Sequence, residues 1–152
     1  MKGAGGVTCV GFTIALMLFG CGLTSTTTIQ NVEQTAYEDK ARLEQQWGVQ
    51  ICGIRLSAAD YMLDFRYRVI DPEKAKPLLS RQVKPYLVDQ ESGAKLIVPA
   101  PPKVGSLRQK SNEPLPGKIY FIIFSNPGKL VKRGNKVTVV IGDFSAEGLI
   151  VK

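Results

Sequence analysis

The strongest constraint on the fold is the stretch YMLDFRYRVI, residues 61–70, in which apolar and charged side chains alternate. Successive side chains of a β-strand point to opposite faces of the sheet. The odd-numbered positions therefore place apolar residues on one face: Tyr61, Leu63, Phe65, Tyr67 and Val69. The other face is mostly charged and carries Asp64, Arg66 and Arg68. This pattern predicts a half-buried antiparallel strand, with the charged face forming either a solvated ladder or a binding surface.

Further strands are predicted on both sides of this one. VQICGIRL (49–56) forms a hairpin with it through the turn SAAD, and Cys52 lies in phase with Ile54 and Leu56, so we expect its thiol to be buried. VKPYLVDQ and AKLIV flank a turn at residues 91–93, and Pro85 predicts an edge strand or a bulge there. KIYFIIFSN (118–126) has apolar residues on both faces of the strand, which predicts a central strand covered on both sides. GNKVTVVIGDF and GLIVK complete the series.

Several short strands separated by turns, with no long helix among them, predict an all-β domain, an antiparallel β-sandwich over residues 48–152. Its only helical segment is DPEKAKPLL, which we expect to begin after Asp71 and to stop at Pro77. A short amphipathic helix over residues 31–47 precedes the domain, with an apolar stripe of Val32, Ala36, Leu43 and Trp47. That stripe packs on the domain or binds a partner.

The beginning of the chain has the pattern of an export signal. Lys2 is followed by an uncharged, apolar run from Val7 to Leu23, which ends in small residues. The run is also near the short limit for crossing the ~30 Å hydrocarbon core of a bilayer. It is therefore either a signal peptide over residues 1–20 or an uncleaved membrane anchor.

The sequence Leu18-Phe19-Gly20-Cys21 resembles the lipobox of bacterial lipoproteins, although Phe19 departs from the small residue usual at that position. The resemblance implies that Cys21 is lipidated and becomes the first residue after cleavage, followed by a tether over residues 21–30. It also implies a lipid-anchored protein of the cell envelope, on the outer membrane and facing the periplasm if the cell has two membranes. The strand order resembles immunoglobulin-like envelope domains, and GIRLSAADYMLDFRYRVIDPEKAKPLL resembles uncharacterised bacterial envelope proteins.

The composition restricts the chemistry. The chain contains no histidine, which removes the usual general base and the commonest metal ligand. Of three cysteines, only Cys52 would remain free in the mature protein, so neither a disulfide nor a thiolate metal site is expected. Glycine motifs for phosphates or dinucleotides are absent as well. We therefore expect a non-catalytic protein without cofactor or metal.

Positive charge is concentrated between Lys103 and Lys136. This segment has eight basic residues and one acid, Glu113, so its formal charge of +7 equals that of the whole chain. The asymmetry predicts an anionic partner, such as a lipid, a polymer or an acidic protein, or else charge that merely keeps loops soluble. No motif points to nucleic acid. The candidate anion-binding residues are Lys103, Arg108, Lys110, Lys129, Lys132, Arg133 and Lys136. Part of this charge lies in a proline-rich loop, residues 99–118, whose length predicts a functional or mobile segment.

The sequence thus favours a membrane-tethered, non-catalytic binding or structural module of the cell envelope. An accessory subunit that docks on a larger envelope complex is the alternative, and an enzyme without a recognisable motif is a third hypothesis.

Overall fold

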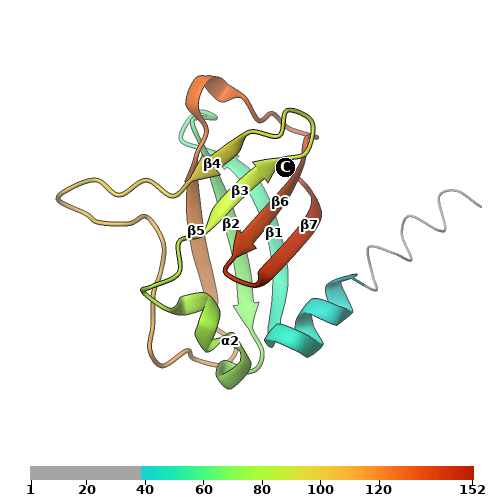
Figure 1. The fold of residues 1–152 in the computed structure, drawn as a ribbon, viewed down its shortest axis with the longest axis vertical. Coiled ribbons are helices and arrows are strands. Elements are labelled where there is room, and N and C mark those ends of the chain that lie inside the picture. The colour runs from blue at the N-terminus through green and yellow to red at the C-terminus, as the bar shows by residue number, and fades with distance from the viewer. Residues whose placement is uncertain (1–38) are drawn as a thin grey trace, which may run out of the picture.

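The computed structural model describes residues 39–152, whose strands form two antiparallel sheets (Figure 1). The first sheet has the order β1-β2-β5 and is built from β1 (Val49–Ser57), β2 (Met62–Val69) and β5 (Ile119–Ser125). The second has the order β4-β3-β6-β7 and is built from β3 (Tyr86–Asp89), β4 (Lys95–Ile97), β6 (Lys136–Ile141) and β7 (Phe144–Ile150). The fold is mostly β, as expected for a β-sandwich. The predicted signal peptide, Cys21, the tether and the start of the first helix lie outside the described residues.

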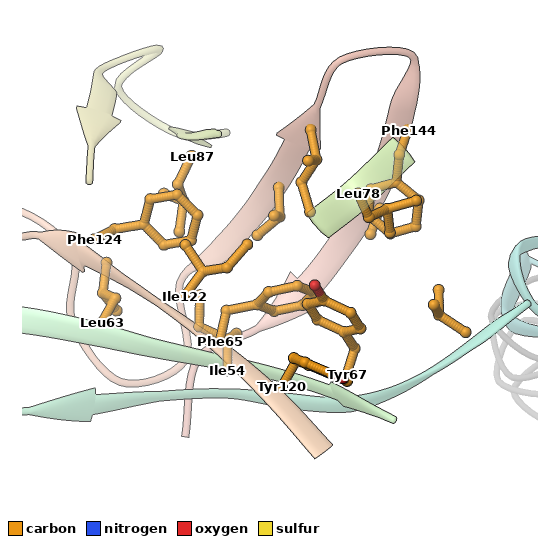
Figure 2. Close-up of a cluster of buried hydrophobic side chains, with 14 of the residues drawn as sticks. Ile54, Leu63, Phe65, Tyr67, Leu78, Leu87, Tyr120, Ile122, Phe124 and Phe144 are labelled. Carbon is orange, nitrogen blue, oxygen red and sulfur yellow. The ribbon is translucent and has the colours of Figure 1, made fainter. Parts of the chain in front are cut away.

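The core lies between the sheets and follows the predicted alternation. In β2, Leu63, Phe65, Tyr67 and Val69 are at most 1% exposed, whereas Tyr61, just before the strand, is 56% exposed. Figure 2 shows aromatic rings of β2 and β5 together in this cluster, among them Tyr67 and Tyr120, whose ring centroids are 6.2 Å apart. Burying side chains of this size supplies most of the stability of a sandwich.

A helix over residues 39–47 packs on the domain through the end of the predicted apolar stripe. Leu43 is buried, and Trp47 meets the ring of Phe144 in an edge-to-face contact of 5.9 Å. Gly48 ends the helix with φ +62°, and a Cβ on this residue would lie 2.6 Å from the Cβ of Asp71, so only glycine fits there without strain. No helix within residues 39–152 is long and apolar enough to span a membrane.

The second helix, α2 (Pro72–Leu79), begins as predicted and ends later. The Asp71 carboxylate accepts hydrogen bonds from the backbone N–H groups of Glu73 and Lys74, and Pro72 occupies the first helical turn. The prediction that Pro77 stops the helix is wrong. Pro77 removes one helical hydrogen bond, the one that an N–H at this position would donate to the carbonyl of Glu73. Two more residues, Leu78 and Leu79, stay helical, because burial of their side chains offsets this loss.

The prediction that Cys52 is buried is wrong, because β1 contains a bulge at this residue. Ile51 pairs with Tyr67 and Gly53 pairs with Arg66, which leaves Cys52 without a partner in the ladder. An extra residue shifts the alternation of side chains by one position. The buried positions of β1 are therefore Val49 before the bulge and Ile54 after it, and the thiol of Cys52 is exposed.

Two further strand predictions are corrected. The strand after Pro85 is not an edge: β3 lies between β4 and β6, and Pro85 immediately precedes it, where no ladder hydrogen bond is required. The apolar segment from Lys118 to Asn126 is not central: β5 ends the order of the first sheet, and residues of the long loop cover its outer edge. That covering positions the cavity described next.

Candidate functional site

A cavity of about 480 Å³ lies at the side of the sandwich, between the second sheet and the long loop. Three segments line it. The connection from α2 to β3 contributes Arg81, Val83, Lys84 and Pro85; the strands β3 and β4 contribute Tyr86, Lys95 and Ile97; and Val98, just after β4, and the loop contribute the rest, with Ala100, Ser106, Arg108 and Lys110 in the loop. Ligand sites of small molecules usually have volumes of roughly 300–1,000 Å³, so the cavity has the size of such a site.

The loop is held against the sandwich by backbone hydrogen bonds at its middle. The N–H of Ile123 donates to the carbonyl of Leu107 at 2.9 Å, and the N–H of Gln109 donates to the carbonyl of Phe121 at 3.1 Å. These bonds satisfy the outer edge of β5, which would otherwise expose unpaired backbone groups. Figure 1 shows the loop leaving β4 and extending to the side before it returns to β5. The loop predicted to be functional or mobile thus forms one wall of the cavity.

The side chains of the cavity carry positive charge only. Of its lining residues, all of which lie in the described part of the chain, five are basic and none is acidic; the basic ones are Arg81, Lys84, Lys95, Arg108 and Lys110. Arg81, Lys84, Lys95 and Lys110 are exposed, and the Nζ of Lys95 lies 3.6 Å from the centre of the Tyr86 ring. Basic groups that converge without a neutralising carboxylate attract an anion and repel a cation.

Arg108 is the unusual member of this set, because it is only 7% exposed. Its Nη2 donates to the backbone carbonyl of Ser80, whereas its buried Nη1 has no hydrogen-bond partner among the described residues. Burial lowers the pKa of this guanidinium. Burial in turn raises the pKa of Tyr67, so its hydroxyl stays protonated. A buried cation with an unused donor is costly, and a function in binding is one reason for a fold to hold it.

The predicted anion-binding residues divide into two groups. Arg108 and Lys110 line the cavity, and Arg108 lies opposite Ile122 in the middle of β5. Lys129, Lys132, Arg133 and Lys136 follow the end of β5, and neither they nor Lys103 line the cavity. Within the second group, Lys129 places its Nζ 4.9 Å from the centre of the Tyr61 ring. Two of the seven predicted residues therefore line the cavity, and the other five do not.

Sequence reasoning missed three of the cavity's basic residues, Arg81, Lys84 and Lys95. They lie outside the basic segment. Residues 74–84 nevertheless carry four basic side chains and no acidic one, a local signal that could have pointed to Arg81 and Lys84, whereas Lys95 follows Asp89 and Glu91. The folded chain adds them to Arg108 and Lys110 because α2 ends beside the loop: the N–H of Ser111 donates to the carbonyl of Leu79 at 3.3 Å. A separation of almost thirty residues along the chain hides this proximity from any local pattern.

The charged outer face of β2 has a structural role. The Asp64 carboxylate is 4% exposed and accepts hydrogen bonds from both Arg55 and Arg66, with the shortest N–O distances at 2.9 Å. This face is therefore not simply a solvated ladder, because the two arginines cover and neutralise the acid. No group of three or more acidic or cysteine side chains that could hold a metal ion occurs within residues 39–152.

Comparison of the chain with protein-family models, with curated proteins and with solved structures found no match to any of them.

Proposed function

We propose that this protein is a non-catalytic, membrane-tethered module of the bacterial cell envelope that binds an anionic ligand in the cavity beside β3 and β4. The observation that carries the proposal is the convergence of five basic side chains and no acidic one on a cavity of about 480 Å³. Binding there requires no nucleophile or general base. Charge and a preformed shape are sufficient.

The tether is part of the same proposal and is supported by the sequence alone. The apolar run that ends at Cys21 would anchor the protein through a lipid on that cysteine. Cys21→Ala should then abolish incorporation of labelled fatty acid and leave the precursor uncut. A native mature terminus at another residue, without lipid, would refute the lipoprotein assignment.

We also propose that the sandwich is immunoglobulin-like. The orders β1-β2-β5 and β4-β3-β6-β7 agree with the A-B-E and C′-C-F-G strands of such domains. In this arrangement the cavity lies beside the strands equivalent to C and C′. The long loop takes the place of the connection between C′ and E.

Anion binding is tested with the full-length protein in nanodiscs of neutral lipid, titrated with inorganic pyrophosphate by calorimetry over a series of salt concentrations. Exposed charges are screened over about 8 Å at physiological ionic strength, so the affinity should fall as salt rises. Each of two positive charges close to the ligand should contribute about 1 kcal/mol or more to the free energy of binding, which is lost when the charge is removed. The double variant Lys84→Gln/Lys110→Gln should therefore bind at least tenfold more weakly.

The matched control is Lys132→Gln/Arg133→Gln, which removes the same charge from the connection between β5 and β6. It should change the affinity less than about twofold, because these positions do not line the cavity. Equal effects of the two double variants would place binding outside the cavity. Failure of the wild-type protein to bind pyrophosphate at low salt would overturn the proposal.

A further inference from the structure

The cavity has an apolar side as well as a basic one. Ile97 is 61% exposed on the outer face of β4, although a branched apolar side chain is usually buried. It pairs in register with Tyr86 on β3, and Val83, Pro85 and Val98 line the same space. A ligand with charge alone would leave this apolar surface in contact with water.

We infer, on the basis of the proposed function, that the ligand is an amphiphilic phosphate: a phosphate ester whose head group contacts the basic side chains and whose alkyl chain covers Ile97, Tyr86 and their neighbours. Phosphate fits the head-group position better than a carboxylate, because five basic residues exceed what one negative charge can balance. Arginine and lysine together are also the usual partners of phosphate oxygens.

The arrangement of the wall supports an extended chain. Tyr86 and Ile97 lie side by side on neighbouring strands, and Val98 continues from Ile97 into the loop. Lys95, two residues before Ile97, points to the same face of β4 and lies over the Tyr86 ring. Positive charge and apolar surface therefore lie next to each other on β4. An amphiphile has a charged group next to an apolar chain, so its two parts can contact these two surfaces at once.

The experiment is a homologous series of water-soluble phosphate esters, from methyl to hexyl phosphate, titrated by calorimetry against the full-length protein in neutral nanodiscs, with empty nanodiscs as the blank. Each buried methylene group contributes about 0.8 kcal/mol when fully covered, or roughly fourfold in affinity, and about twofold when half covered. Hexyl phosphate should therefore bind at least about thirtyfold more tightly than methyl phosphate.

Ile97→Gln is the diagnostic variant and Ile150→Gln its matched control. Both residues are exposed isoleucines at the end of a strand, 61% and 57% exposed, so neither change should unfold the protein, and Ile150 does not line the cavity. Ile97→Gln should weaken the binding of hexyl phosphate much more than that of methyl phosphate, and so reduce the dependence of affinity on chain length. Ile150→Gln should change neither.

The outcomes separate this inference from the function on which it rests. If pyrophosphate binds but affinity does not rise with chain length, the anion site stands and the amphiphile is refuted. If neither pyrophosphate nor any ester binds, both are refuted. Hexanoate binding as tightly as hexyl phosphate would overturn the assignment of the head group. Competition of hexyl phosphate with phosphatidic acid in the nanodisc would identify a membrane lipid as the source, and binding without competition would identify a soluble ester.

Discussion

Replacing Arg108 by methionine should separate the contribution of this residue to binding from its contribution to stability. The guanidinium is 7% exposed, donates one hydrogen bond to the Ser80 carbonyl and leaves Nη1 unpaired. Losing a hydrogen bond from a charged group costs about 1.5–3 kcal/mol, and removing a buried, unsatisfied donor regains about 1–3 kcal/mol. Methionine also fills the space with a flexible apolar chain. The free energy of unfolding should therefore change by no more than about 2 kcal/mol.

The same substitution should weaken anion binding considerably. A unit charge about 8 Å from the ligand contributes about 2 kcal/mol at an effective dielectric constant of about 20, which corresponds to roughly thirtyfold in the dissociation constant. Arg108→Lys keeps the charge, so it should retain most of the affinity. Binding is measured with pyrophosphate, as for the cavity variants.

Stability is measured by urea unfolding, with the fluorescence of Trp47 as the probe. Trp47 is the only tryptophan of the chain and packs on Phe144, so its signal reports loss of the fold. If Arg108→Met lost 3 kcal/mol or more while the folded fraction bound pyrophosphate normally, Arg108 would be a structural link between the loop and α2. Arg108 would then have no role in anion binding.

The remaining predictions concern the fold. Phe65→Ala should lower the free energy of unfolding by about 3–5 kcal/mol because Phe65 is fully buried. Arg66→Ala removes a half-exposed side chain and leaves Asp64 paired with Arg55, so it should cost only about 1 kcal/mol; equal losses of the two variants in urea would show that the buried face of β2 is wrongly assigned. Asn126→Ala removes three hydrogen bonds of a buried amide to Asp60 and Val131, so it should cost about 2–4 kcal/mol in the same assay, and a loss below 1 kcal/mol would show that water replaces them. Burial disfavours the charged form of Asp89, but hydrogen bonds from Ser92 and Asn135 outweigh it and lower the pKa. The stabilisation is therefore present above about pH 4 and is lost as the pH falls through the folded pKa, so Asp89→Asn should flatten the decline of the melting temperature in acid; an unchanged decline would assign it to other groups. Cys52 should react with a thiol reagent as fast in the native protein as in urea, and slow labelling before unfolding would contradict its exposure.

Much of the fold could be predicted from local patterns, because those patterns describe interactions between near neighbours. The alternation in residues 61–70 identified the buried face of β2, and Asp71-Pro72 marked the start of α2. The turn at residues 91–93 was also predicted, and Gly93 takes the positive φ that such a turn requires. The mostly β class follows from these elements together.

The predictions that failed depended on contacts between distant segments. Nothing in VQICGIRL indicates that Cys52 is the extra residue of a bulge, because a bulge is defined by the partner strand as much as by its own sequence. An apolar strand such as β5 is expected to be central, yet here a loop segment closes its outer edge.

The candidate site shows the same division. The sequence by itself determined that the chain is rich in positive charge, lacks histidine and places much of its charge between Lys103 and Lys136. Only the tertiary structure decided which of the charged side chains lie together. Arg108 and Lys110 of that segment line the cavity with Arg81, Lys84 and Lys95, which come from two other segments. The basic residues from Lys129 to Lys136 follow the end of β5 instead. The physical reason is that electrostatic attraction depends on distance in space, and the pairing of strands, not the order of residues, sets that distance.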